Sequence, residues 1–546
     1  MNHYFKLTTS LEKVMLDSNF DFPELKNSSM LKNDIFSFQL ATKFESPNEG
    51  IHEYVTIEVE SPIKEYIRVF RQGYVPVTTP RGIGMCDDDY LFTSPTVAPD
   101  PLFEIYDGKA EIFNGQTRSF WFTIEPSGKV CGVFPVRIII KNDKEEIVGD
   151  TKFEIEIIDC LLPEQKLINS CWFHGDCIST HHNAEVFSDK YWELTDKYMA
   201  IYRKFGHNMI LTPVVTPPLD TQIGGERPTN QLVEVYFDNG VYSFDFQKLS
   251  KWIELAKKND IHNFEIAHLF TQWGAKFTPK VMAHVNGEYK KIFGWEVESL
   301  SDEYKAFLKA FLPALIAELK KHGVYENSYF HVSDEPMPEH KQQYLAAKEL
   351  IIEFVPESQL IDALASFEFY EEGIVKHPIV SNDHINKFLD AEVEGLRTYY
   401  CVCQGDKVAN RFMAMPSYRN RVLGIQLYKN NIIGFLQWGF NFWYSKLSKF
   451  AIDPFMTNDS SGFISGDAFV VYPVDSKDNV VVSSRLYVFN EALQDVRALD
   501  LLESLTNRDY VLGLLEDFYR FTDYPRCNDY YINLRETINR EISKHI

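Results

Sequence analysis

Short segments of the first 160 residues alternate apolar and polar positions. The alternation is clear over 55–59 and 153–157, and the runs 119–124 and 136–140 are rich in aromatic and β-branched residues. Turns that contain proline and glycine separate these segments. A period of two with one apolar face is typical of antiparallel strands that are buried on one side. The pattern predicts an N-terminal antiparallel β-sandwich over residues 1–160.

The pattern changes after a linker at 160–165, where strand-like runs begin to alternate with amphipathic helical segments. Eight such units between residues 165 and 506 predict a (β/α)8 TIM-like barrel with long insertions. A doubly wound sheet is the alternative, but no glycine-rich nucleotide-binding loop follows any strand. Residues 507–546 are helical and polar, which predicts a short C-terminal helical segment. The candidate barrel strands are 168–173, 209–215, 264–270, 329–332, 360–365, 379–381, 397–403 and 432–436.

The fourth candidate strand ends in two adjacent carboxylates, Asp334 and Glu335, followed by Pro336. A helix precedes it, with Ser299 and Ser301 as candidate caps and an apolar i, i+4 stripe from Phe307 to Leu319. Adjacent acids often mean only a solvated loop or the start of a helix. Acids at the carboxyl end of a buried barrel strand, however, lie where such barrels place their catalytic groups. We therefore interpret Asp334 and Glu335 as a catalytic pair.

Aromatic and polar residues follow several other candidate strands. Sugars present apolar faces that stack on aromatic rings, and hydroxyls that hydrogen-bond to amides and carboxylates. Core filling is the alternative for each tryptophan taken alone. The residues we expect to bind substrate are Trp172, His174, His268, Trp273, Trp438, Asn441 and Tyr472.

Metal and cofactor sites are not predicted. His174, His181, His182 and His268 could ligate a metal, but none lies in an HExxH motif or another tight ligand spacing. No Gly-x-Ser-x-Gly motif indicates a serine nucleophile.

Charge and cysteine content narrow the partners and the location. The formal net charge of −23 argues against nucleic acid and anionic membranes as partners. No segment has the apolar length of a membrane helix, and the first 20 residues lack the apolar core of a signal peptide. The eight cysteines form no CxxC pair. We therefore expect free thiols and a cytoplasmic protein that acts on a glycan or glycoconjugate; the oligomeric state is not predicted.

Several motifs in order along the chain resemble glycoside hydrolase family 123. They are the strand with Asp334-Glu335-Pro336, Asn410-Arg411-Phe412, the run Phe435 to Trp443, the run Gly466 to Pro473, and Ser484-Arg485-Leu486. The resemblance covers roughly residues 165–510 and also implies an N-terminal sandwich. Characterised members are β-N-acetylgalactosaminidases. The resemblance implies that Glu335 is the acid/base and that Asp334 orients the acetamido group, whose carbonyl oxygen is the nucleophile.

The two adjacent acids can both reach one site only if the main chain leaves regular pleating, because neighbours in a strand face opposite sides. Two alternatives to this activity stay open. One is a non-catalytic carbohydrate-binding or scaffold protein. The other is a glycosidase for a sugar without an acetamido group, which would need a second carboxylate across the cleft. Asp176 and Asp467 are the candidates for that carboxylate.

Overall fold

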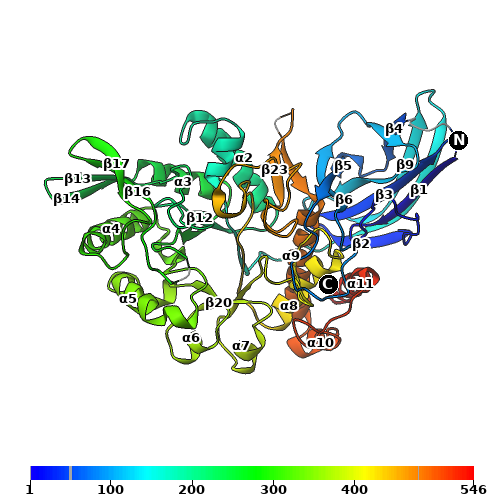
Figure 1. Cartoon of the computed structure of the whole chain (residues 1–546). Coiled ribbons are helices and arrows are strands. Elements are labelled where there is room, and N and C mark those ends of the chain that lie inside the picture. The colour runs from blue at the N-terminus through cyan, green and yellow to red at the C-terminus, as the bar shows by residue number, and fades with distance from the viewer. Residues whose placement is uncertain (1, 48–51, 273, 478) are drawn as a thin grey trace.

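The computed structural model describes residues 2–47, 52–272, 274–477 and 479–546. Figure 1 shows a β-sheet part formed by the N-terminal residues beside a larger α/β part, so the chain is multidomain. Within the described ranges, every helix is too short or too polar to cross a bilayer.

The N-terminal part consists of two facing sheets. Neighbouring strands run antiparallel, apart from β2 and β10, which are parallel. Phe38 stacks on Phe122 of its own sheet at 4.9 Å between ring centroids and meets Phe153 of the facing sheet at 4.7 Å. The predicted antiparallel sheet region is confirmed. The seven-stranded sheet has the order β1 (Asn2–Thr9), β3 (Phe36–Glu45), β8 (Thr117–Ile124), β5 (Ile67–Val77), β6 (Thr96–Glu104), β24 (Val480–Ser483), β23 (Val471–Val474), and the five-stranded sheet the order β2 (Asn27–Leu31), β10 (Ile147–Ile158), β9 (Gly132–Asn142), β4 (His52–Glu60), β7 (Lys109–Phe113).

The last two strands of the seven-stranded sheet come from the far end of the chain. Val482 of β24 pairs with Leu102 of β6. Arg485, which follows β24, donates from Nε and Nη2 to the two carboxylate oxygens of Asp100 at 2.7 and 2.9 Å. The two parts of the chain are therefore joined by backbone hydrogen bonds and by a buried ion pair.

The larger part is built on an eight-stranded parallel sheet. Each predicted strand segment overlaps one of its strands. An isolated parallel bridge between Phe330 and Leu360 links the two outer strands, β18 and β19, so the sheet curls toward closure. Its order is β18 (Ser328–Phe330), β15 (Asn263–Ile266), β12 (Met209–Thr212), β11 (Ile168–Cys171), β22 (Gly434–Gln437), β21 (Arg397–Tyr399), β20 (Pro378–Ser381), β19 (Asp362–Leu364).

Helices of unequal length connect these strands. Two of them, α6 and α7, have only 4 and 5 residues. A curled parallel sheet is therefore established, and the complete (β/α)8 barrel remains a prediction. The helices are α1 (Gly175–His181), α2 (Asp189–Lys204), α3 (Gln247–Lys258), α4 (Asp302–Lys321), α5 (Lys341–Ile352), α6 (Glu368–Glu371), α7 (Asn386–Asp390), α8 (Tyr418–Lys429) and α9 (Ser484–Leu505).

Helix α4 forms as its sequence predicts. The Ser301 side chain caps it by accepting a hydrogen bond from the Tyr304 N–H, and the apolar stripe from Phe307 to Leu319 is buried. Gly323 follows with a φ of +66°, which glycine adopts without strain. Pro313 lies inside the helix, which continues past it.

A separate four-stranded sheet was not predicted. It consists of two hairpins, one between β12 and α3 and the other between β15 and α4. The sheet lies at the edge of the α/β part in Figure 1. Its strands have only five or six residues, but both hairpins turn at an Asn-Gly pair, Asn239-Gly240 and Asn286-Gly287, a signal that could have revealed them. They are, in sheet order, β14 (Val241–Asp245), β13 (Glu234–Asp238), β16 (Val281–Val285) and β17 (Glu288–Phe293).

The C-terminal segment contains two helices, α10 (Arg508–Gly513) and α11 (Asn528–His545), and α11 packs between α9 and β2. Arg535 of α11 forms ion pairs with Asp34 at 2.5 Å and with Asp495 at 2.9 Å. Because these partners belong to the N-terminal part and to α9, this segment contributes to the junction of the two parts.

Helices α8 and α9 approach closely at Gly424, and this gives a stability prediction. A Cβ at Gly424 would lie 2.1 Å from the carbonyl oxygen of Ala492. We expect Gly424→Ala to lower the free energy of unfolding by about 1–3 kcal/mol, because the helices must move apart. Thermal unfolding of the purified variant measures this.

Gly513 is the control, since a Cβ there would meet nothing within 4 Å. We expect Gly513→Ala to be neutral or to stabilise by up to about 1 kcal/mol. Equal unfolding midpoints for the two variants would contradict the close-packing argument.

Candidate active site

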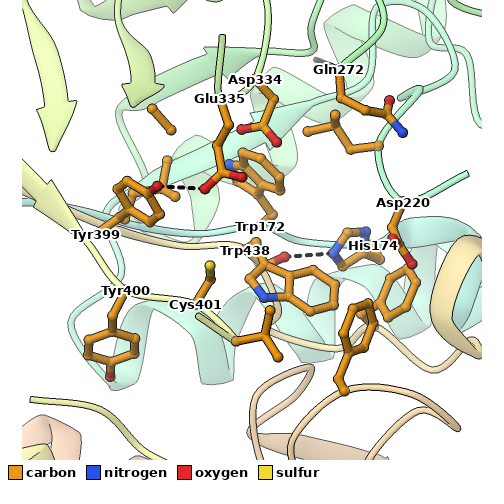
Figure 2. Close-up of a pocket in the computed structure, with 16 residues that line it drawn as sticks. Trp172, His174, Asp220, Gln272, Asp334, Glu335, Tyr399, Tyr400, Cys401 and Trp438 are labelled. Carbon is orange, nitrogen blue, oxygen red and sulfur yellow. Dashed lines mark hydrogen bonds between the residues drawn. The ribbon is translucent and has the colours of Figure 1, made fainter. Parts of the chain in front are cut away.

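A pocket lies at the carboxyl-terminal ends of the parallel strands (Figure 2). The empty space within it, including its open mouth, is about 760 Å³, which is in the range of small-molecule sites. The described residues that line it are Trp172, His174, Leu219, Asp220, Gln272, Asp334, Glu335, Ala363, Tyr399, Tyr400, Cys401, Val402, Leu436, Trp438, Phe442 and Phe463.

Asp334 and Glu335 both line this pocket (Figure 2). The main chain leaves the extended conformation after β18, and Glu335 has a φ of 42°, in the left-handed region. The Glu335 N–H donates to the carbonyl oxygen of Ala363 at 3.1 Å, which holds this turn against the neighbouring strand. The turn therefore brings both carboxylates to one cavity. A non-glycine residue at positive φ is strained, and such strain is concentrated at functional sites.

Tyr399 fixes the orientation of the Glu335 side chain. Its hydroxyl donates to Glu335 Oε1 at 2.5 Å, the contact drawn in Figure 2. Burial and the nearby charge of Glu335 raise the pKa of Tyr399 well above its usual value. Tyr399 therefore stays protonated and acts as a hydrogen-bond donor.

The environment of Asp334 favours its protonated form. Desolvation, followed by the negative charge of Glu335, raises the pKa of Asp334 well above its usual range, while the charge of His331 opposes the shift. Two neighbouring carboxyl groups in a dry site cannot both ionise freely. The pair can therefore hold a proton at a pH where isolated carboxyls have lost theirs, as acid/base catalysis requires.

His331 lies behind the pair, in the core. Its Nε2 is 2.7 Å from Glu265 Oε1, and its Nδ1 is 3.3 Å from Asp362 Oδ1. These two carboxylates raise the pKa of His331 to about 9, although burial opposes the shift. The imidazole is therefore charged at neutral pH and donates to both acids. Glu265 also accepts a hydrogen bond from Nε1 of Trp172 at 2.7 Å, which links this network to the pocket wall.

His268 stacks on His331, with ring centroids 4.1 Å apart. Nitrogen and oxygen atoms of His268, His331 and Asp362 lie close enough together to hold a metal ion. A metal ligand must be a neutral imidazole, whereas both nitrogens of His331 bind carboxylates as donors. The donor set therefore fits an ion-pair network better than a metal site. His268 itself is buried and does not line the pocket.

His174 lines the pocket, but the protein already binds both of its ring nitrogens. Burial, and then the charge of Arg227, lower the pKa of His174 to about 3, so the ring is neutral. Nδ1 accepts from Nη2 of Arg227 at 3.1 Å, and Nε2 donates to the carbonyl oxygen of Trp438 at 3.0 Å. Arg227 in turn forms a buried two-pronged ion pair with Asp176, at 2.8 and 2.7 Å.

Trp438 forms an apolar wall of the pocket. Its indole packs against Phe442 and Phe463, with ring centroids 4.9 and 5.0 Å apart. Its Nε1 donates to Oδ2 of Asp467 at 2.9 Å, so Asp467 fixes the orientation of the indole. Burial raises the pKa of Asp467 to about 7. Neither Asp467 nor Asp176 is among the described lining residues.

The pocket brings together five of the residues predicted from sequence: Asp334, Glu335, Trp172, His174 and Trp438. Three others, His268, Asn441 and Tyr472, are buried and do not line the pocket. Trp273 lies outside the described residues.

Asn441 and Tyr472 are occupied by other parts of the protein. The Asn441 amide accepts from the His174 N–H at 2.8 Å and donates to the His174 carbonyl oxygen at 3.0 Å. Tyr472 belongs to β23 in the shared sheet, and its hydroxyl donates to Asp100. Asn441 therefore positions the main chain of His174, and Tyr472 contributes to the junction of the two parts.

Sequence reasoning missed Asp220, Gln272 and Tyr399 as pocket residues. Tyr399 is the last residue of β21, whereas the predicted strand ran on to residue 403 and so did not place Tyr399 at a strand end. Asp220 lies in an irregular loop after β12, and no local pattern marks it.

Residues 172–502 match the family described as glycoside hydrolase 123, catalytic domain. This match begins at the first strand end of the pocket and includes every described lining residue. No curated protein matches the chain.

The fold is similar to a solved family 123 glycoside hydrolase from Clostridium perfringens, studied for glycolipid glycan hydrolysis. That similarity has a TM-score of 0.76 at 15% identity and covers 100% of this chain and 98% of that one. A Parabacteroides merdae β-glucuronidase (TM-score 0.29, 10% identity, 90% of this chain and 51% of that one) and a Thermobacillus composti GH10 xylanase (0.31, 15%, 60% and 97%) are much less similar. Since the family match spans more than half of the chain and contains the pocket, this protein belongs to glycoside hydrolase family 123.

Proposed function

We propose that this protein is a retaining exo-glycosidase that removes terminal β-linked N-acetylgalactosamine with the help of the substrate's own acetamido group. The observation that carries this proposal is that two adjacent carboxylates, Asp334 and Glu335, line one pocket. An adjacent pair is suited to serving neighbouring groups of one sugar, its C2 substituent and its glycosidic oxygen. Substrate-assisted enzymes are an exception to the rule of two carboxylates flanking the scissile bond.

Glu335 is the general acid and base in this mechanism. It protonates the glycosidic oxygen while the acetamido carbonyl oxygen attacks the anomeric carbon, so the aglycone leaves as an alcohol. The product is a cyclic oxazolinium ion. Glu335 then takes a proton from the water that opens this ring, which restores the acid and retains the configuration. The hydrogen bond from Tyr399 keeps the Glu335 carboxyl in place for both steps.

Asp334 acts on the acetamido group. When the proton of the pair lies on Glu335, Asp334 is ionised. Its carboxylate then accepts a hydrogen bond from the acetamido N–H and opposes the positive charge that develops on the oxazolinium. Because this charge exists only in the transition state and intermediate, the interaction lowers the barrier more than it tightens binding.

The charges of the pocket support a neutral sugar as substrate. The described lining residues include the carboxylates Asp220, Asp334 and Glu335, but neither lysine nor arginine. His174 is neutral, and Arg227 behind it is paired with Asp176. A uronic acid or a sulfated sugar would meet repulsion without a compensating cation. The indole of Trp438 offers an apolar surface to a sugar ring.

A second reading keeps the fold but changes the chemistry. A glycosidase for a sugar without the acetamido group needs a nucleophilic carboxylate about 5 Å from the acid. Asp176 and Asp467 are both held by other groups, away from the described lining. Asp220 lines the pocket and is the remaining candidate for such a nucleophile.

We also propose that the protein is located in the cytoplasm. All eight cysteines are free in the structure. Free thiols support a reducing compartment such as the cytoplasm.

Hydrolysis of three aryl glycosides tests the function. We expect turnover of the 2-acetamido-β-galactoside, less turnover of the 2-acetamido-β-glucoside, and none of the plain β-galactoside, which lacks the internal nucleophile. Turnover of the plain galactoside would favour the second reading. Binding of the sugars without any turnover would indicate a carbohydrate-binding protein.

Glu335→Gln tests the acid/base role. We expect a loss of roughly 100-fold or more in kcat for substrates with poor leaving groups, and a smaller loss for activated aryl glycosides, which need no proton. The active form has Glu335 protonated and Asp334 ionised, and an amide cannot lose the proton that Glu335 loses. The alkaline limb of the pH profile should therefore be absent from the remaining activity. Unchanged turnover by the folded variant would refute the assignment.

Asp334→Asn tests the charge opposite the oxazolinium. The loss should appear mainly in kcat, because the amide keeps the size but not the charge. A thiazoline mimic of the intermediate should bind the wild type more tightly than the parent sugar does, and should lose most of that advantage in the variant. A covalent sugar ester on any carboxylate, detected by mass spectrometry, would overturn the scheme.

A further inference from the structure

Some polar groups of the pocket form hydrogen bonds to other groups of the protein, and others have none. Both nitrogens of His174 bind the protein, and the Tyr399 hydroxyl donates to Glu335. Three groups of the described lining outside Asp334 and Glu335 keep a free oxygen: Gln272, Asp220 and the Tyr400 hydroxyl. Gln272 and Asp220 lie together on the side of the pocket away from Tyr399, and Tyr400 lies on the side of Tyr399 (Figure 2).

Gln272 has a buried oxygen with no partner in the described structure. The side chain is only 5% exposed, and its Nε2 donates to the carbonyl oxygen of Thr221 at 3.0 Å. This bond fixes the amide so that Oε1 is the remaining atom, and Oε1 has no hydrogen bond. A buried acceptor without a partner destabilises the site. A donor from a bound molecule would remove this destabilisation.

Asp220 is held in position by a neighbouring loop. Its Oδ2 accepts from the Leu447 N–H at 2.7 Å, and its carbonyl oxygen accepts from the Ser448 hydroxyl at 2.6 Å. Asp220, Leu447 and Ser448 all have positive φ, at 40°, 62° and 51°. Strained main chain in two loops that hold one carboxylate is typical of a binding site. Oδ1 remains available to a ligand.

The two acceptors form one subsite, because the Gln272 amide binds Thr221, the residue next to Asp220. We propose that Asp220 and Gln272 bind the C4 hydroxyl of the terminal sugar and so determine specificity at that position. This inference rests on the proposed function. If Glu335 holds the C1 oxygen and Asp334 the C2 substituent, the wall beyond Asp334, which carries Gln272 and Asp220, faces the ring carbons that follow C2 (Figure 2). C4 lies across the ring from C1.

The chemistry of this subsite fits a hydroxyl. A carboxylate oxygen and an amide oxygen are acceptors, and a sugar hydroxyl donates one hydrogen bond, to the better placed of the two, and accepts others. Burial raises the pKa of Asp220, and the Leu447 N–H opposes this. An anionic substituent at C4 would be repelled, whereas a missing hydroxyl would leave the acceptors unpaired.

The test compares wild type and Asp220→Asn on aryl 2-acetamido-β-galactoside and on its 4-deoxy analogue. We expect kcat/KM of the wild type to fall roughly 10- to 100-fold when the hydroxyl is removed, because a hydrogen bond to a charged acceptor is lost. We expect a similar loss for Asp220→Asn on the intact substrate, and little further loss on the 4-deoxy analogue, because both changes remove one interaction. Gln272→Met should show the same non-additive losses in kcat/KM. It replaces Asp220→Asn as the test variant if Asp220→Asn does not fold.

Three results would overturn the proposal. The first is that the losses in kcat/KM from Asp220→Asn and from the 4-deoxy substrate are additive. Another is that the wild type turns over both substrates equally well. The third is that Asp220→Ala forms a glycosyl azide in the presence of azide, which would make Asp220 the nucleophile. Asp453→Asn is the matched control, because Asp453 caps the Phe455 N–H at 3.0 Å outside the pocket. It should behave as the wild type does.

A binding measurement separates this inference from the proposed function. If the wild type hydrolyses neither substrate, the proposed function fails. Calorimetry with free N-acetylgalactosamine and its 4-deoxy form then tests the subsite alone. Tighter binding of the intact sugar by the wild type, and equal binding of both by Asp220→Asn, would support it. Equal binding of both sugars by the wild type, or binding of neither, would overturn it.

Discussion

A single protonated imidazole sets the balance of charge beneath the pocket. His331 lies between Glu265 and Asp362, and its positive charge opposes the rise in the pKa of Asp334 that burial and Glu335 cause. Four carboxylates in so small and dry a region would otherwise take up protons or force the site open. The buried cation lets β18 end in two acids and lets the core around the pocket stay closed.

The positions of Glu335 and Asp220 in the pocket depend on strained main chain that other segments hold in place. Glu335 is fixed in its left-handed turn by the carbonyl of Ala363, and Asp220 by Leu447 and Ser448. Each contact joins segments that follow different strands or lie far apart in the chain. The parallel sheet provides the rigid base, and these cross-links position the side chains before a ligand binds. Such preorganisation reduces the entropy that binding would otherwise cost.

The elements that could be predicted from the sequence are those that a local pattern of residues encodes. Buried parallel strands appear as apolar runs, so the eight strands and the acids at the end of β18 could be found. Asp220 could not, because the residue that holds it, Leu447, is 227 positions away. Asn441 and Tyr472 were predicted at the pocket from their place in a motif. Their side chains face His174 and Asp100 instead, and residue order alone does not determine such directions.

The distribution of donors and acceptors connects the fold to the choice of substrate. The donors of Tyr399 and His174 bind acceptors of the protein, whereas the Tyr400 hydroxyl has no partner among the described residues. The free oxygens of Asp220, Gln272, Asp334 and Glu335 can accept hydrogen bonds from a ligand. In the function proposed above, a neutral sugar supplies such donors through its hydroxyls and its acetamido N–H, and it adds no negative charge to the pocket. Because unpaired buried acceptors are costly, the same groups would penalise a ligand that lacks those donors.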